Sequence, residues 1–287
     1  MTGISSVPSD QKKWIDSVMH AYIPKQKRLR TLFSEEPVDP SQVTNIYGRL
    51  TQSYTEAKGY YTMDDPQQLA DGATAEADTQ GSEDVTSTQK TYSKGFVAYR
   101  KLLESGLEFQ KSFLARFTVE ALNTVENYTN TTLNTNMASN AGQSYTATGG
   151  TWATSGDPVA DVVDAKNSFR KRSGGFEADF ISLHPDNKAD VEKDFRFQNT
   201  LYSKSGDLLD GGTITPKPLA LNWVEDTAVT KGTFFLGKKG MFGRLVVSEP
   251  YKMYEKAAGT GDKRFDAVFS FIDQYPLPQY LMYGTGI

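Results

Sequence analysis

The sequence predicts an α+β fold built around one long helix and one long β-hairpin. Between residues 107 and 135, apolar side chains recur every four positions, as they do on one buried face of a helix. Between 248 and 272, two β-forming stretches flank a Gly-Thr-Gly-Asp turn, and apolar residues alternate with polar ones in the second stretch. A helix–turn–strand pattern at 157–185 predicts a smaller mixed unit between these two features.

The composition limits the classes of protein to which the chain can belong. Of its 287 residues, 38% are hydrophobic and 12% aromatic, which is enough for a core and excludes global disorder. No apolar run approaches roughly 18 residues, so no membrane-spanning segment is predicted, and the first residues lack the pattern of a secretory signal. With no cysteine and two histidines, disulfides, thiolate catalysis and sites that need three imidazoles are excluded.

The net charge of −4 is unevenly distributed along the chain. Residues 1–33 carry six bases and two acids, whereas residues 34–89 carry eleven acids and two bases. Such asymmetry predicts that these segments contact oppositely charged surfaces, for example on other copies of the chain. Two solvated faces of opposite charge are the alternative interpretation.

The first hundred residues predict an N-terminal arm and an extended hairpin, neither of which belongs to a compact core. A short amphipathic helix is expected at 10–23, and the prolines spaced through 24–45 predict an extended arm without packed elements. Residues 56–89 are polar and acidic, and 90–100 is rich in β-forming residues. A long loop that returns through a strand predicts an extended hairpin.

The long helix is the clearest element in the sequence. Phe109, Phe113, Phe117, Ala121 and Val125 form its apolar stripe, and we expect Phe113 and Phe117 to be buried under a sheet. A run of about 27 residues extends roughly 40 Å at 1.5 Å per residue. The helix is expected to fade in the Thr/Asn-rich stretch 129–140, where helix propensity is low.

The following hundred residues predict a small domain of helices and short strands. After a Gly/Ser/Thr/Ala linker at 141–156, Asp157 and Pro158 are typical of a helix start, and Gly174-Gly175 of a helix end. A strand at 176–183 ends at His184-Pro185, where we expect a turn and then a second helix. Short strands are expected at 219–224, 233–237 and 244–247.

The last forty residues predict the long hairpin and a final strand at 280–283. In the second arm of the hairpin, Phe265, Ala267, Phe269 and Phe271 alternate with more polar residues. This period of two predicts that one face of the hairpin is buried.

The search for catalytic chemistry finds only incomplete motifs. Residues 232–238 match most of a phosphate-binding loop, but Lys239 stands where a Ser or Thr hydroxyl would bind Mg²⁺, and the interior is β-forming. Neither a Gly-x-Ser-x-Gly elbow nor a His-Glu-x-x-His motif occurs. The sequence therefore predicts no catalytic residue, no cofactor site and no metal site.

In its order of elements the chain resembles the Hong Kong 97-type capsid fold of tailed bacterial and archaeal viruses. Residues 88–105 resemble the strand of the extended loop that returns into the spine helix of that family, 157–185 its axial helix, turn and strand, and 251–272 its peripheral hairpin. The resemblance covers nearly the whole chain. It implies an N-terminal arm (1–45), an extended loop with flanks (46–105), a spine helix of the peripheral domain (106–140), an axial domain (141–247), and a peripheral hairpin with terminal strand (248–287).

The resemblance also implies a function. A major capsid protein self-assembles, in the host cytoplasm, into the pentamers and hexamers of an icosahedral shell that encloses double-stranded DNA, and remains in the virion. Contacts with DNA are expected to be non-specific, no membrane is expected to be involved, and scaffolding, portal and decoration proteins are candidate partners. An arm and a protruding loop gain burial only on neighbouring copies. The candidate subunit-contact residues are Lys25, Lys27, Arg28, Arg30, Asp64, Asp65, Asp71, Glu76, Asp78, Glu83, Asp84, Lys90 and Lys94.

Two other functions fit the same sequence. An encapsulin-type cellular nanocompartment shares the fold and packages a cargo enzyme instead of a genome. A β-rich carbohydrate-binding or hydrolytic protein belongs to a different class, which the aromatic content permits.

Overall fold

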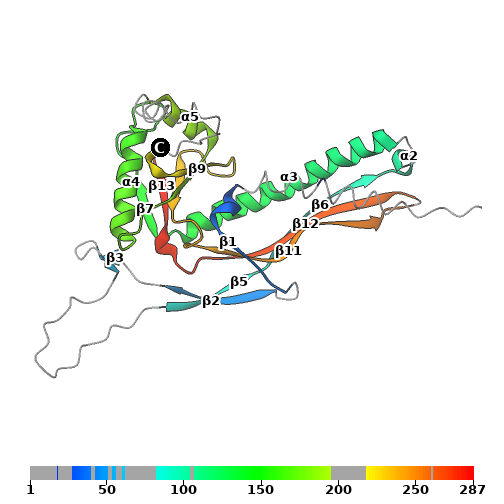
Figure 1. The fold of residues 1–287 in the computed structure, drawn as a ribbon, viewed down its shortest axis with the longest axis horizontal. Helices are drawn as coiled ribbons and strands as arrows, with labels where there is room; N and C mark the ends of the chain where they lie inside the picture. Colours follow the sequence, from blue (N-terminus) through cyan, green and yellow to red (C-terminus); the bar gives the residue numbers. More distant parts are fainter. Residues whose placement is uncertain are drawn as a thin grey trace, which may run out of the picture.

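The computed structural model describes residues 18, 28–39, 43–50, 54–55, 60–61, 82–103, 107–194, 218–259 and 261–287. These residues form an elongated molecule (Figure 1). A long helix lies along one sheet, and a second sheet with two helices closes one end of the molecule. The predicted α+β class is confirmed.

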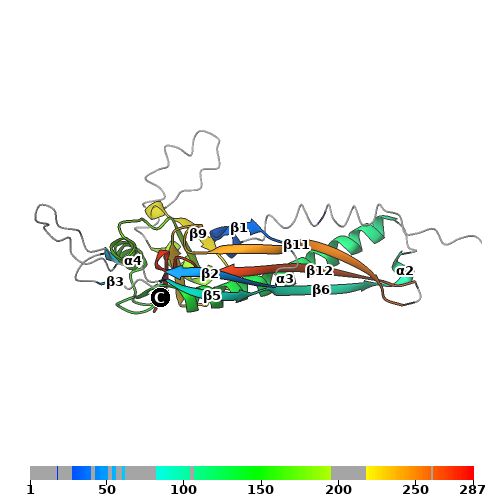
Figure 2. The same ribbon diagram turned by 90° about the horizontal axis from the view of Figure 1, so that it is seen from below.

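The long sheet has four strands in the order β1-β11-β12-β6. β1 pairs in parallel with β11, and the other neighbours are antiparallel. The view from below (Figure 2) shows β11, β12 and β6 side by side along the molecule. The predicted hairpin is confirmed, and Phe265, Ala267, Phe269 and Phe271 are buried as expected. The strands are β1 (Ser34–Pro37), β6 (Lys90–Ala98), β11 (Arg244–Ala257) and β12 (Lys263–Gln274).

Helix α3 (Leu107–Asn140) covers this sheet and follows the short α2 (Arg100–Leu103). Its 34 residues extend about 51 Å at 1.5 Å per residue. The predicted fading at 129–140 is wrong, because Leu133 and Met137 are fully buried in the core there. Burial outweighs the low helix propensity of Thr and Asn, and the Thr129 hydroxyl donates to the carbonyl of Val125 at 2.9 Å within the helix.

Near the other end of α3, the expected burial is only partly present. Phe113 and Phe117 remain partly exposed, although the Phe117 ring centroid lies 5.7 Å from that of Phe96 on β6. The edge of the sheet, where β6 lies, covers these rings incompletely in a single chain.

The second sheet has five strands in the order β7-β13-β10-β8-β9. Two predictions about its limits are wrong. The expected linker at 141–156 contains β7, and the terminal strand, assigned by sequence to the peripheral hairpin, is β13 and pairs with β7 and β10. The strands are β7 (Gln143–Thr146), β8 (Phe180–Leu183), β9 (Asn222–Glu225), β10 (Thr233–Gly237) and β13 (Leu281–Thr285), with 3-10 turns η3 (Pro218–Ala220) and η4 (Pro278–Tyr280).

The predicted domain boundary at 247 is also displaced. β11 begins at Arg244 and continues without interruption to Ala257, so the boundary cuts through one strand of the long sheet. The structure places the change of sheet in the turn before Arg244, after β10 has ended at Gly237.

Helices α4 (Pro158–Arg172) and α5 (Pro185–Lys193) begin as the sequence predicts. The Asp157 carboxylate accepts from the Ala160 N–H at 2.9 Å, and His184 Nδ1 accepts from the Asp186 N–H at 3.1 Å. Both caps are followed by proline in the first turn, whose missing N–H costs nothing there. None of the helices in the described ranges has the length and hydropathy needed to cross a membrane.

A separate two-stranded hairpin lies below the junction of the two sheets in Figure 1. It consists of β2 (Thr44–Leu50) and β5 (Ser82–Thr88), with a second short ladder between β3 (Tyr54–Thr55) and β4 (Tyr60–Tyr61). An extended hairpin is present, but its returning strand is β5, within the polar stretch expected to be loop, whereas the expected returning strand at 90–100 is β6 and pairs with β12 of the long sheet. Residues 62–81 lie outside the described residues.

The segment before this hairpin contradicts the prediction of an unpacked arm through residue 45. In η1 (Leu29–Leu32) and at Phe33 the apolar side chains are buried, and β1 joins the long sheet. Apolar residues at 29, 32 and 33 fill a space beside α3 that the proline spacing alone does not indicate. The helix expected at 10–23 lies, apart from Val18, outside the described residues.

Candidate subunit-contact site

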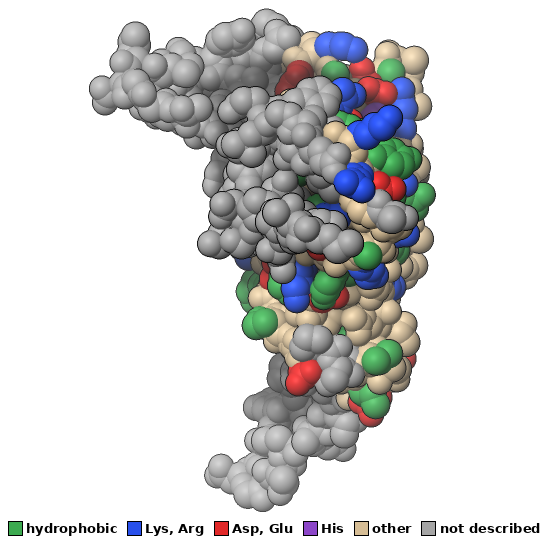
Figure 3. All heavy atoms as spheres, turned by 90° about the vertical axis from the view of Figure 1, so that its right-hand side faces the viewer, with side chains coloured by type: hydrophobic (Ala, Val, Ile, Leu, Met, Phe, Trp, Pro, Cys, Tyr) green, Lys and Arg blue, Asp and Glu red, His purple; other side chains and the backbone are tan. Residues whose placement is uncertain are grey.

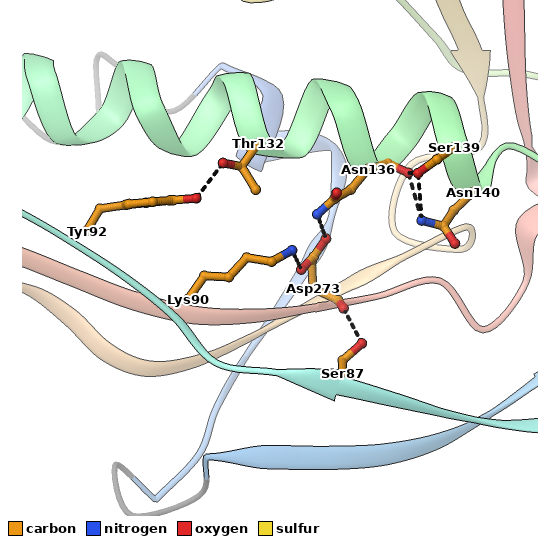
Figure 4. Close-up of polar contacts among 8 residues, drawn as sticks. All are labelled: Ser87, Lys90, Tyr92, Thr132, Asn136, Ser139, Asn140 and Asp273. Atoms are coloured by element: carbon orange, nitrogen blue, oxygen red, sulfur yellow. Dashed lines mark hydrogen bonds and ion pairs between the residues drawn. The ribbon is translucent and has the colours of Figure 1, made fainter.

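The β2–β5 hairpin meets the body of the chain beside Asp273 on β12. Figure 4 shows Lys90, Asn136 and Ser87 converging on Asp273. Lys90 Nζ lies 2.6 Å from one carboxylate oxygen, Asn136 Nδ2 donates to the other at 2.5 Å, and the Ser87 hydroxyl donates to the Asp273 backbone carbonyl at 3.0 Å. We call these four residues the hairpin anchor. The anchor joins the hairpin, β6, α3 and β12 at one point.

One face of the hairpin is turned toward the body of its own chain. Tyr47 is 5% exposed and, with Tyr275 and Asp273, lines a cavity of about 240 Å³ behind the hairpin. Burial, together with the negative charge of Asp273, raises the pKa of the Tyr275 phenol well above its usual value. Arg49 adds a bond at 3.1 Å from its guanidinium to the side-chain oxygen of Asn140 at the end of α3.

The opposite face of the hairpin is exposed. Val43 and Ile46 are 63% and 66% exposed, and Asp84 lies on the same face as Ile46. We call Ile46 and Asp84 the hairpin outer face. Large apolar side chains exposed on a projecting element are typical of a surface that a partner covers.

Residues 29–37 are held against the body by a buried cluster around Arg30. Arg30 is 2% exposed, and its guanidinium lies 2.9 Å from Glu35 and 3.6 Å from Glu126 of α3. The Tyr251 hydroxyl donates to Glu126, and its pKa is raised by burial and by that carboxylate. The expectation that Arg30 contacts another subunit is therefore wrong, because its side chain is buried and pairs with carboxylates of the same chain.

The other predicted contact residues fall into three groups. Arg28 is exposed but donates to the Glu225 carbonyl at 3.2 Å. Lys90 belongs to the hairpin anchor, where it pairs with Asp273 of its own chain. Glu83, Asp84 and Lys94 are exposed and remain candidates. Lys25, Lys27, Asp64, Asp65, Asp71, Glu76 and Asp78 lie outside the described residues.

The end of the molecule that carries α2 shows mixed charge. In Figure 3, Lys and Arg side chains lie among acidic and polar ones over the upper part of this end. The described residues on this face therefore form no block of a single sign.

Sequence reasoning missed Asp273, Asn136 and Ser87. Lys90 and Asp273 are 183 positions apart, and the sequence contains no signal that pairs them. The one available indication is Asp273 itself, a charged residue directly after the apolar stripe of the predicted hairpin. A buried carboxylate requires a partner, but pattern alone does not name it.

Comparison with known proteins agrees with this architecture. Residues 82–269, more than half of the chain, match the family model of phage capsid proteins. No protein with a curated description matches the sequence significantly.

Several solved structures share the fold at low sequence identity. A virus-like particle from Pyrococcus furiosus is 9% identical, with a TM-score of 0.59 over 95% of this chain and 98% of that one. The capsid of a native GTA particle is 11% identical, with a TM-score of 0.63 over 91% and 90%. A chain of Gordonia phage Cozz is 12% identical, with a TM-score of 0.58 over 90% and 85%. Together with the sequence match, this shared fold shows that the chain belongs to the phage capsid protein family, whose members form shells with the Hong Kong 97-type fold.

Proposed function

We propose that this chain is the major capsid protein of a tailed virus, which assembles into pentamers and hexamers of an icosahedral shell around double-stranded DNA. The observation that carries the proposal is the projecting hairpin, which packs against the body on one face and exposes the large apolar side chain of Ile46 on the other. A surface of this kind, matched by a different surface on the next copy, forms a heterologous contact, and such contacts close into rings.

In this proposal each of the two sheets belongs to a different domain. We assign the long sheet with α3 to the peripheral domain and the five-stranded sheet with α4 and α5 to the axial domain. The acidic loop 56–89 and the basic residues before Arg28 then face opposite charge on neighbouring copies. DNA is contacted non-specifically, and scaffolding, portal and decoration proteins complete the particle, which is built in the host cytoplasm.

Electron microscopy of the purified protein tests the assembly. Closed shells with fivefold and sixfold capsomers are the expected result. A protein that stays monomeric at all concentrations and salt conditions contradicts the proposal.

The content of particles isolated from the native source tests the role. Double-stranded DNA protected from added nuclease is expected inside the shell. A packaged cargo protein in place of DNA favours the encapsulin-type compartment instead. The carbohydrate-binding or hydrolytic alternative has lost its support, because the family to which the chain belongs supports a structural role.

A further inference from the structure

A basic surface with an exposed aromatic ring lies where α4 ends. Phe176, in the segment after the helix, is 45% exposed, and its ring packs edge-on against Tyr280 with centroids 5.2 Å apart. Cations from the end of α4 and from the turn after β10 lie beside this segment. We call this surface the foot patch and define it by Arg170, Lys171, Phe176, Lys238 and Lys239.

Two separate elements bring the cations of the foot patch together. Glu177 lies 3.6 Å from Arg170 of α4. Asp179, two residues further on, lies 3.4 Å from Lys238 and accepts from the Lys239 N–H at 2.7 Å. Cations in the last turn of a helix interact favourably with its dipole, but this reason does not apply to the two lysines after β10. Their position beside the end of α4 therefore needs another explanation.

The backbone gives the aromatic centre of the patch a fixed position. Gly174 and Gly175 adopt φ values of 72° and 91°, which turn the chain sharply after the helix. The Ser173 hydroxyl, buried beneath this turn, donates to the Phe176 carbonyl at 2.7 Å. The exposed ring is thus held in place by its own backbone and by its contact with Tyr280.

The foot patch keeps positive charge after its internal ion pairs are formed. Its four cations stand against two carboxylates, in a chain whose net charge is −4. Lys171 and Lys239 are exposed, and within the described ranges neither side chain has an ion-pair partner. Cations gathered on one surface repel one another, and an external anion relieves that repulsion. The patch is therefore suited to a partner that carries several negative charges.

Duplex DNA has the chemistry that this surface fits. Its backbone carries one negative charge per ~1.7 Å of helix axis, whatever its base sequence. Lys and Arg side chains contact its phosphate oxygens and sugars without reading the bases. The long side chains of Lys171 and Lys239 allow them to follow successive phosphates, and the ring of Phe176 offers an apolar surface to the sugar between them.

We propose that the foot patch is the surface through which this chain contacts packaged duplex DNA. The inference rests on the proposed function and adds the site of the non-specific contact. Lys171 and Lys239 bind phosphates, and Arg170 and Lys238 add positive potential beside them. This contact assigns the end of α4 to the inner side of the shell. With about two phosphates neutralised, one copy binds weakly, and repetition over the shell makes the sum significant.

Binding of a fluorescently labelled DNA duplex to unassembled subunits tests the charges. Lys171→Gln with Lys239→Gln should weaken binding about tenfold at low salt and make the slope of log K against log salt shallower by about 2. The matched control is Lys101→Gln with Lys252→Gln, which removes two exposed lysines elsewhere and should bind as native. Equal losses in the two variants overturn the inference, and so does a native subunit that does not bind the duplex.

The aromatic ring and the class of partner are tested in the same assay. Phe176→Ser should weaken binding about threefold and leave the salt slope unchanged, because it removes apolar contact and no charge. A polyglutamate peptide at equal concentration of charge should not displace the duplex. Displacement by that peptide would favour an acidic protein partner and overturn the inference.

Formaldehyde cross-linking of native particles tests the contact in the shell. Peptides that contain Lys171 or Lys239 should be recovered attached to DNA. DNA-filled particles in which only other lysines are attached overturn the inference and leave the proposed function intact. Particles that contain no DNA contradict the proposed function, and the inference with it.

Discussion

The guanidinium carbon of Arg30 lies 4.1 Å from the centroid of the Phe269 ring, in the middle of the core between α3 and the long sheet. A buried cation is costly unless carboxylates and aromatic faces replace its water. Glu35 and Glu126 supply the carboxylates, and Tyr251, stacked on Phe269 with centroids 4.6 Å apart, completes the aromatic surroundings. The segment that precedes β1 is thus part of the core.

Replacing Arg30 should destabilise the subunit itself. In Arg30→Met the free energy of unfolding should fall by about 3–5 kcal/mol, because Glu126 remains buried without this cation. Urea denaturation measures the change. Arg116→Met is the matched control, since Arg116 is 78% exposed in its pair with Glu120, and it should cost about 0–1 kcal/mol. Equal losses in the two variants would show that the Arg30 cluster contributes no more than a surface pair.

The hairpin anchor should control the hairpin without controlling the whole fold. Asp273→Asn removes the charge that holds Lys90 and one acceptor for Asn136, so we expect a loss of about 1–3 kcal/mol. Hydrogen exchange at residues 82–90 should accelerate more than exchange in α4. Glu83→Gln, which weakens only an exposed pair with Arg49 at 3.8 Å, should leave both measurements close to native. Uniform acceleration in α4 and the hairpin would argue against a local anchor.

Gly95 on β6 lies directly under the carboxylate of Asp266. A Cβ at this position would stand 2.0 Å from Asp266 Oδ1, and that carboxylate is held by Arg264 at 2.7 Å. Gly95→Ala should therefore cost about 1–3 kcal/mol through overpacking. Gly48→Ala is the control, because a Cβ there meets nothing within 4 Å. Thermal unfolding of both variants measures the difference, and a Gly95→Ala protein as stable as Gly48→Ala would contradict the steric argument.

The partial exposure of Phe117 lowers the expected cost of its truncation. Phe265→Ala should cost about 3–5 kcal/mol, because Phe265 is 2% exposed in the core. Phe117→Ala removes a ring that keeps contact with Phe96 and Phe113 but not full burial, so its loss should be clearly smaller. Chemical denaturation of the two variants measures the loss in free energy of unfolding for each. A larger loss for Phe117→Ala would place that ring deeper in the core than the structure does.

Alkaline pH should weaken the subunit through its buried phenols. Burial, and then the negative charges of Asp161 and Asp164, raise the pKa of Tyr145 from 10.0 to about 12. The folded state therefore favours the neutral phenol, so this stabilisation is fully present below pH 10.0 and is lost as pH rises toward 12. Melting temperatures should fall across this window, and less steeply in Tyr145→Phe. Tyr128→Phe, at a 63% exposed position, should follow the native profile.

Elements whose signals are local could be predicted from the amino-acid sequence. The four-residue spacing of α3, the Asp157-Pro158 start of α4 and the alternation Phe265 to Phe271 each depend on neighbours within a few positions. The order of these elements also indicated the fold, because few architectures combine such a helix, hairpin and loop in that order.

Contacts between residues far apart in the chain could not be predicted in this way. Thr129 and Asn130 stay helical because the core buries them, β13 leaves the long hairpin for the other sheet, and Arg30 is drawn into the core by Glu126 and Phe269. Each of these outcomes depends on burial supplied by residues far away in the chain, and such burial outweighs local propensity and proline spacing. The hairpin anchor could not be predicted from the sequence for the same reason. Asp273 acquires its role only where β12, α3 and the hairpin come together.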